Sequence, residues 1–246
     1  MSDFEDRPAA SPDAGEPFME RLVYIFTEPE RVFRAVRRRP AWLPAFFLVL
    51  LFAVLSIQAT YPLVAETQRE AILSRSDLTA EEAQRAVESI EMFEGPAGRL
   101  IMTLTVVIST TVSFLVIAGA LLFGGNFLLG GETGFKTVMG LTAYAWIPYS
   151  IGKAVVQVPL VLAKGSLAVS TSLNVLLPPD RWSSPLGIVL GSVDIFAIWM
   201  IVLVTIGMST VYGFSRRRSA GLVVGLYAAS VLLFAGLSAL TSGIMS

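Results

Sequence analysis

Five long apolar stretches constrain how this 246-residue chain can fold more than any other feature. A helix needs about 20 mostly apolar residues to cross the hydrocarbon core of a bilayer. In lipid the backbone satisfies its hydrogen bonds only as a helix or a closed barrel, and the sequence lacks the alternating pattern of barrel strands. We therefore predict an all-α, polytopic membrane protein with a five-transmembrane-helix bundle. The predicted spans are about 42–61, 100–123, 137–163, 185–212 and 221–244.

The polar segments divide the rest of the chain. Residues 1–17 are acidic and contain prolines, which predicts a disordered cytoplasmic tail. Residues 18–40 are typical of a basic amphipathic interfacial helix, and 41–246 form the membrane domain, with a helical outer loop at 62–98. Two Thr-x-x-Glu spacings, at Thr27 and at Thr79, are typical of the capping box that starts a helix.

The basic residues predict how the chain is oriented. Arginines cluster at 37–39 and 216–218, and both clusters fall on one side of the bilayer if the five spans are correct. Because cytoplasmic loops carry an excess of Lys and Arg, we expect the N-terminus in the cytoplasm and the C-terminus outside. The first span follows a leader of about 40 residues and is longer than a signal-peptide core, so it should stay as an anchor in a bacterial inner membrane.

The amphipathic segment before the first span predicts contact with lipid. Val32, Phe33 and Val36 share one face, and arginines form the other. This pattern is typical of a helix in the cytoplasmic headgroup layer, where anionic lipids attract basic side chains. A positive-inside anchor without lipid specificity shows the same pattern and is the more common case. The candidate headgroup ligands are Arg31, Arg34, Arg37, Arg38 and Arg39.

Composition excludes several classes of chemistry. The chain has no histidine and no cysteine, which excludes Cys/His zinc sites, thiol redox chemistry, and Ser–His–Asp or Cys–His catalysis. The spans hold one carboxylate, which gives no acid/base pair. We predict no catalytic residues, metal or cofactor, and no nucleic-acid partner. The expected partners are the lipid bilayer, with anionic lipids at its cytoplasmic face, and in addition a membrane protein or a second copy of the chain.

Two ionisable residues lie within the predicted spans, Lys153 and Asp194. Such residues usually face the interior of a bundle and mark functional sites. Each lies about nine residues from the outer end of its helix, roughly 13 Å deep at 1.5 Å per residue. Equal depth on consecutive antiparallel helices predicts a buried ion pair.

The third span carries further polar side chains. Two prolines, Pro148 and Pro159, predict a kink in this helix. A broken helix with a polar stripe is how transporters build midplane sites, but a kinked helix whose polar groups satisfy one another shows the same pattern. The stripe, at helical spacing, consists of Thr142, Trp146, Tyr149, Lys153 and Gln157.

Small residues at four-residue spacing predict close helix contacts. Gly187 and Gly191 lie in the fourth span, and Gly221 and Gly225 lie in the fifth. Such residues more often pack helices together than bind a ligand.

Three stretches carry a family resemblance. They read FTEPERVFRAVRRRPAWLPAF before the first span, GFKTVMGLTAYAWIPYSIG in the third, and VDIFAIWMIVLVTIGMSTVYGFSRRRS across the fourth. Together they resemble bacterial members of the Yip family, integral membrane proteins named for interaction with Ypt/Rab GTPases. The resemblance implies a five-span protein with a cytoplasmic N-terminus. Eukaryotic relatives are non-enzymatic and are linked to Rab GTPases and vesicle trafficking, and no catalytic residue carries over.

These observations lead to two functional hypotheses. The first is a non-enzymatic membrane protein with a membrane-organising or protein-interaction role. The alternative is a transporter or channel subunit for a small solute, lipid or ion, in which Lys153, Asp194, Tyr149 and Gln157 line the path.

Overall fold

The computed structural model describes residues 16–75 and 77–244, and these residues form a helical membrane protein. Five of the described helices are long and apolar enough to cross a membrane, which confirms the predicted fold class. The predicted tail at 1–17 lies outside the described residues, except for its last two. The α-helices are α1 (Phe18–Thr27), α2 (Pro29–Arg38), α3 (Leu43–Leu73), α4 (Ala80–Glu94), α5 (Pro96–Phe123), α6 (Phe135–Gly152), α7 (Val158–Lys164), α8 (Pro185–Ser192), α9 (Ile195–Tyr212) and α10 (Arg216–Ile244).

Four short helices of other types join these elements. Two π-helices extend α5 and α6, and two 3-10 helices lie between α7 and α8. They are η1 (Gly124–Leu128), η2 (Lys153–Gln157), η3 (Leu173–Leu176) and η4 (Pro179–Arg181).

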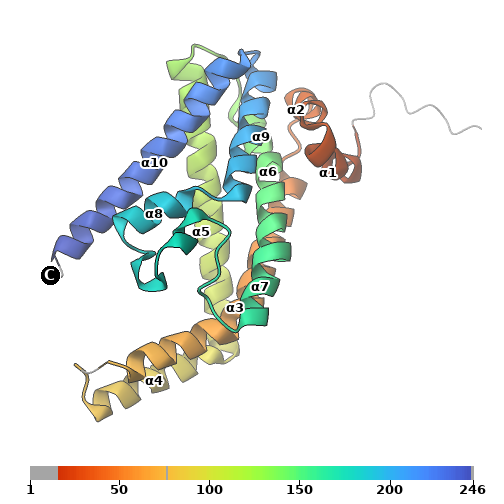
Figure 1. Cartoon of the computed structure of the whole chain (residues 1–246). Coiled ribbons are helices and arrows are strands. Elements are labelled where there is room, and N and C mark those ends of the chain that lie inside the picture. Colours follow the sequence, from red (N-terminus) through yellow and green to blue (C-terminus); the bar gives the residue numbers. More distant parts are fainter. Residues whose placement is uncertain (1–15, 76, 245–246) are drawn as a thin grey trace, which may run out of the picture.

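The long helices form a bundle around α6, and α10 leans away from it (Figure 1). Helix α6 packs against α9, α3 and α5, and its Leu141, Tyr144 and Ile147 are fully or almost fully buried. The α1–α2 unit lies beside one end of the bundle, near the start of α10. We call this the basic end, because it carries Arg37–Arg39 and Arg216–Arg218. The opposite end carries α4.

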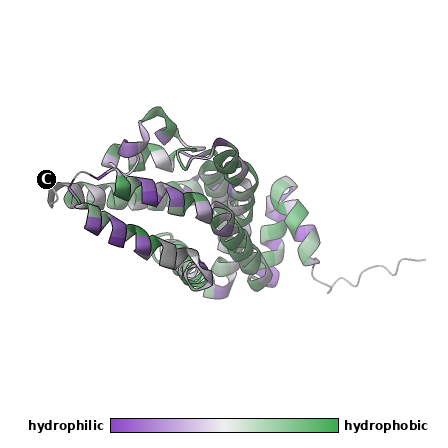
Figure 2. Ribbon diagram, turned by 90° about the horizontal axis from the view of Figure 1, so that it is seen from below, coloured by the Kyte–Doolittle hydropathy of each residue, from purple (hydrophilic) through white to green (hydrophobic). Residues whose placement is uncertain are grey.

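The predicted outer loop is a helical arm at the α4 end. Helix α3 runs past the predicted end of the first span, through Pro62, to Leu73, and α4 returns beside it. The predicted capping box at Thr79 is confirmed: its hydroxyl accepts the Glu82 N–H, and the Glu82 carboxylate accepts the Thr79 N–H at 2.9 Å. Figure 2 shows hydrophilic residues concentrated on this arm, whereas the bundle behind it is mostly hydrophobic.

The segment predicted as one amphipathic helix is two helices, α1 and α2, with Glu28 between them. The capping box predicted at Thr27 is wrong. Pro29 occupies the first turn of α2, where a missing N–H costs nothing, and no side chain caps that end. The Thr27 hydroxyl instead donates to the carbonyl of Val23 within α1.

The apolar face of α2 contacts protein instead of the predicted lipid headgroup layer. Val32, Phe33 and Val36 are fully buried in the same core as α6 and α9. Two glycines make room for them. A Cβ added to Gly140 would come within 2.7 Å of a Val36 methyl group, and one added to Gly207 within 3.2 Å of the Phe33 ring. Because Gly140 and Gly207 have no side chains, α2 packs directly on the bundle.

Two of the predicted spans are discontinuous. The third begins as α6, changes to the π-helix η2 at Lys153, and ends as α7, so the interruption lies between Pro148 and Pro159. The fourth, predicted as one helix over 185–212, is α8 and α9 separated by two residues. This prediction was wrong because Asp194 caps α9 with its carboxylate and therefore does not continue a helix.

The predicted packing glycines have different surroundings. A Cβ on Gly187 would meet the carbonyl oxygens of Arg181 and Trp182, so this glycine packs on the loop before α8 and not on another helix. Gly191 has only ordinary contact with Asn174. Gly221 and Gly225 have no atom within 4 Å of an added Cβ, so the structure contradicts their predicted role in packing within this chain.

A candidate polar site where three breaks in the membrane helices meet

Three irregular segments of backbone meet inside the membrane domain. The first is η2. The second is the chain after α7, which turns at Gly165, a residue with a positive φ of 56°, and runs back along the bundle. The third is the break between α8 and α9. An antiparallel bridge between Ser172 and Asp194 joins the second and third segments. Irregular backbone at membrane depth needs partners within the protein, and this convergence supplies them.

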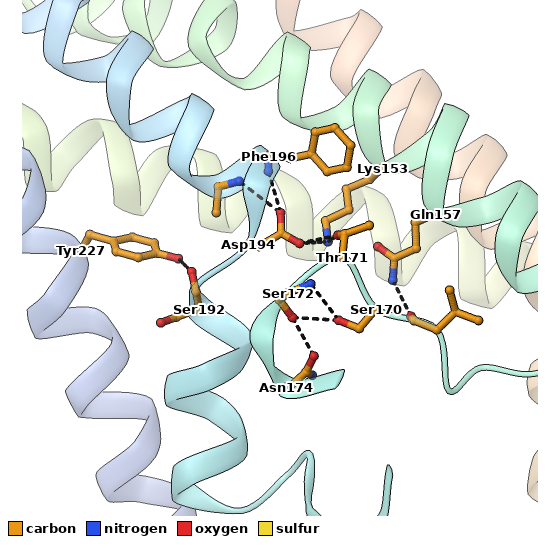
Figure 3. Close-up of polar contacts among 12 residues, drawn as sticks. Lys153, Gln157, Ser170, Thr171, Ser172, Asn174, Ser192, Asp194, Phe196 and Tyr227 are labelled. Carbon is orange, nitrogen blue, oxygen red and sulfur yellow. Dashed lines mark hydrogen bonds and ion pairs between the residues drawn. The ribbon is translucent and has the colours of Figure 1, made fainter. Parts of the chain in front are cut away.

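The predicted ion pair between Lys153 and Asp194 lies at this junction (Figure 3). The Lys153 Nζ is 2.7 Å from the Asp194 Oδ2, and the Asp194 residue is 4% exposed. The Thr171 hydroxyl accepts a hydrogen bond from Lys153 at 2.9 Å and donates to the same carboxylate oxygen. The three side chains therefore form one closed cluster.

The other carboxylate oxygen of Asp194 holds the start of α9. It accepts hydrogen bonds from the backbone N–H groups of Phe196 at 2.9 Å and Ala197 at 3.2 Å. These donors have no partner within the helix itself, so the carboxylate satisfies N–H groups that would otherwise be left unpaired inside the protein. One residue thus caps a helix and neutralises a lysine.

A glycine allows the two helices to approach at the junction. A Cβ on Gly152 would come within 2.3 Å of the Phe196 ring, so any larger residue would push α6 away from α9. The Lys153 Nζ lies 6.0 Å from the centre of the same ring and 5.8 Å from that of Tyr149. Both distances fall within the range of cation–π attraction.

Lys153 and Asp194 together carry no net charge. A single charge in the membrane interior costs several kcal/mol, and pairing removes most of that cost. An ammonium group has three N–H donors, and the described residues accept from two of them, through Thr171 and Asp194. The site is therefore neutral overall but retains hydrogen-bonding capacity.

Hydroxyl and amide groups extend the cluster along the returning segment. The Ser172 hydroxyl lies 2.7 Å from the Ser170 hydroxyl and donates to the side-chain carbonyl of Asn174, also at 2.7 Å. The Gln157 amide donates to the carbonyl of Val169 at 3.1 Å. On the other side of the junction, the Tyr227 hydroxyl donates to the carbonyl of Ser192.

The structure brings together only part of the predicted polar stripe. Tyr149 and Gln157 lie beside Lys153 at the junction. Thr142 is buried, and its hydroxyl donates to the carbonyl of Val138 in its own helix. Trp146 stacks on Phe114 of α5, with ring centres 6.0 Å apart. These last two side chains belong to the packed core.

Thr171 was missed by the sequence reasoning, because it lies outside the predicted spans. The signal for it was the run of hydroxyl residues SLAVSTSLN between the third and fourth spans. Such a run in an otherwise apolar region indicates backbone that returns into the membrane.

The candidate headgroup arginines lie on α2 and at its end. Arg34, Arg37, Arg38 and Arg39 are exposed, and Arg31 is half-buried. Arg31 lies over the Tyr24 ring and pairs with Glu16 at 2.6 Å, a hydrogen bond that raises the pKa of its guanidinium. Ion pairs and hydrogen bonds also tie this region to the bundle, with Arg37 donating to the carbonyl of Thr210 at 3.4 Å and Arg216 pairing with Glu30.

Metal-binding groups do not gather in the parts of the chain that the structure describes: residues 16–75 and 77–244 contain no cluster of three or more His, Cys, Asp or Glu side chains. The junction offers one carboxylate and one ammonium, a set suited to hydrogen bonding.

Comparison with known proteins relates the chain to one family and to one bacterial relative. A family model described as the Yip1 domain matches residues 23–239, which covers both the basic end and the polar junction. The chain is also similar to the membrane protein YknW of Bacillus subtilis (strain 168), with 28% identity over 222 residues that cover 88% of this chain and 90% of the relative. No solved structure matches the chain.

Proposed function

Because the chain belongs to the Yip1 domain family, we propose that it is a non-enzymatic protein of a bacterial inner membrane that binds a partner membrane protein through its basic end. The bacterial relative is a membrane protein, which agrees with this location. The resemblance to a family with interaction roles and the absence of His and Cys from the chain both favour binding over catalysis.

The observation that carries this proposal is the fixed position of α2. Its apolar face is fully buried against α6 and α9, so its arginines are held on a rigid support. A surface on a rigid helix loses less backbone entropy when it binds than a flexible segment does, which favours a defined partner. The Arg216–Glu30 ion pair adds the start of α10 to the same surface.

The orientation is part of the proposal. The clusters Arg37–Arg39 and Arg216–Arg218 lie at one end of the bundle, and Lys136 lies in the first turn of α6 at that end. The excess of basic residues on the cytoplasmic side of membrane proteins supports a cytoplasmic basic end. The C-terminus and the α4 arm are then outside.

Site-specific photo-crosslinking in cells tests the proposed function. A photoreactive amino acid at position 38, on the exposed basic face, should capture one defined membrane protein, and position 104 on the apolar surface of α5 serves as control. Reversing charge at Arg34 and Arg37 should abolish the adduct. Adducts with lipid or with the chain itself at position 38 would contradict binding to another protein.

One observation favours the second candidate, a transporter or channel subunit. A pocket of about 370 Å³ reaches Lys153 and Gln157, although Asp194 and Tyr149 do not line it. Transport predicts solute flux across reconstituted vesicles that stops when Ala53→Phe fills this pocket. Flux that persists in the variant would remove this pocket from the path.

A further inference from the structure

Helix α1 has an apolar face that points away from the bundle. Met19, Val23 and Phe26 follow one another at helical spacing, and they are 69%, 61% and 40% exposed. The opposite face packs on the bundle through Ile25, which is fully buried. In α2 the arrangement is reversed, because its apolar face is buried and its exposed side carries arginines. The two helices therefore present different chemistry to their surroundings.

A ring contact with α9 shows how deep the end of α1 lies. The Phe26 ring meets the Trp199 ring edge to face, with ring centres 5.5 Å apart. Trp199 lies about three turns, or 16 Å, along α9 from Thr210, whose carbonyl accepts the hydrogen bond from Arg37. Half of the hydrocarbon core is about 15 Å thick. The Phe26 ring is therefore far below the level of the arginines.

The start of α1 also lies deeper than α2. The Phe18 ring is 6.3 Å from the Tyr144 ring of α6, whereas Val36 of α2 contacts Gly140. Tyr144 is one turn farther from the basic end than Gly140, a distance of about 6 Å along α6. In agreement, α2 lies nearer the basic end than α1 does (Figure 1). Both ends of α1 thus lie beside the interior of spanning helices.

The polar side chains of α1 lie on its side toward α2. Tyr24 faces α2, since the Arg31 guanidinium lies 3.8 Å from the centre of its ring. Glu20 is one turn before Tyr24 and Thr27 is one turn after it, so both share that side of the helix. The outward apolar face is therefore separate from the charged side chain of Glu20.

The apolar face of α1 continues an exposed apolar stripe of α9. Acyl chains surround a spanning helix inside the bilayer, so its exposed apolar side chains face lipid. Because the Phe26 ring contacts Trp199, a member of the stripe, the two surfaces form one. The stripe consists of Ile195, Ile198, Trp199 and Val202.

We propose that α1 is inserted into the bilayer leaflet at the basic end, with Met19, Val23 and Phe26 in contact with acyl chains. Amphipathic helices on a membrane ordinarily lie at the boundary between headgroups and chains. Helix α1 lies deeper because it packs on two spanning helices, while α2 carries its arginines at the level of the headgroups. This surface is separate from those arginines, and it does not depend on the partner protein proposed above.

Collision measurements on spin labels test the proposal. The chain has no cysteine, so Met19→Cys or Val23→Cys gives a single labelling position on the outward face. Each intact variant is reconstituted into phosphatidylcholine vesicles without any other protein. Collisions are measured with molecular oxygen, which concentrates in hydrocarbon, and with a neutral nickel chelate, which concentrates in water.

Two further positions serve as references for these measurements. Val202→Cys reports a side chain in lipid on α9, and Glu88→Cys reports a side chain in water on the α4 arm. We expect the ratio of oxygen to chelate collisions at positions 19 and 23 to match that at position 202 and to exceed that at position 88 severalfold.

Two other results would overturn the proposal. Frequent collisions with the chelate at positions 19 and 23 would place this face in water. Few collisions with either reagent would show that protein, such as a second copy of the chain, covers it. Since the vesicles contain only this chain, neither result bears on a partner protein at the basic end.

Val23→Asp tests the same face without a label. A carboxylate in hydrocarbon is costly, so α1 should loosen and backbone hydrogen exchange over Phe18–Thr27 should rise severalfold. Val23→Leu keeps the face apolar and should exchange like the unaltered chain. Equal exchange in the two variants would contradict insertion, because an aspartate on a face in water costs little.

Discussion

Val36 of α2 lies against Gly140 of α6, and any side chain on that glycine would occupy the space of the valine: an added Cβ would come within 2.7 Å of a Val36 methyl group. This contact joins an N-terminal helix to the centre of the membrane domain. Because of this contact, α2 and the arginines on its exposed face are fixed to the bundle.

Gly140→Val should therefore loosen α2. Overpacking of this kind typically costs 1–3 kcal/mol, so we expect faster backbone hydrogen exchange over Pro29–Arg38. Gly225→Ala on α10, where an added Cβ meets nothing within 4 Å, is the matched control and should exchange like the unaltered chain. Unchanged exchange in α2 after Gly140→Val would show that this contact does not hold the helix.

The capping box of α4 predicts a response to pH. Hydrogen bonds from the Thr79 backbone and hydroxyl hold the pKa of Glu82 below its ordinary value of 4.5. Since the pKa is lowered in the folded state, this stabilisation is present above pH 4.5 and is lost as the pH falls through the folded-state pKa. The protection of the first-turn amides of α4 against hydrogen exchange, measured relative to the intrinsic exchange rate at each pH, should fall over that window.

Thr79→Ala supplies the control for this pH effect. It removes the hydroxyl from the cap, so exchange in the first turn should already be faster at pH 7 and should change less on acidification. Glu88→Gln, outside the capping box, should keep the pH response of the unaltered chain. The same acid response in Glu82→Gln, which has no carboxylate to protonate at this position, would assign it to another group.

Thr171→Val tests the hydroxyl that joins the ion pair. The variant keeps the shape of the side chain but removes hydrogen bonds to two charged groups. Such bonds contribute about 1.5–3 kcal/mol, and we expect a loss of that size in the free energy of unfolding in detergent. Thr105→Val, on an exposed face of α5, should be neutral because its hydroxyl only bonds its own helix. Equal stability of the two variants would contradict the role of Thr171.

Periodicity and length predicted the five apolar helices, because lipid leaves the backbone few alternatives. They also predicted the pairing of Lys153 with Asp194, since both residues lay at similar depth on adjacent spans. Both features depend on distances along single helices, and these follow directly from residue counts.

Features that depend on contacts between distant segments were harder to predict. The sequence around Asp194 is apolar enough to continue a helix, and only its hydrogen bonds to Phe196 and Ala197 make it a helix start. The burial of Phe33 requires Gly207, which is distant in the sequence. The hydrogen bond from Thr171 to Asp194 depends on a loop that folds back toward the bundle.

Lys153 and Asp194 act as one neutral unit that holds the broken membrane helices together. Asp194→Asn keeps a good helix cap but leaves the ammonium unpaired, and Lys153→Met leaves the carboxylate unpaired. Breaking a buried pair from either side typically costs 3–5 kcal/mol. We expect each single variant to lose stability in that range.

The most direct test is a double-mutant cycle on the free energy of unfolding, measured in detergent, for Lys153→Met, Asp194→Asn and the two combined. If the residues act as a unit, the combined variant should be more stable than the sum of the single losses predicts, because no unpaired charge remains. Losses that simply add would contradict the claim that the two residues act as one unit.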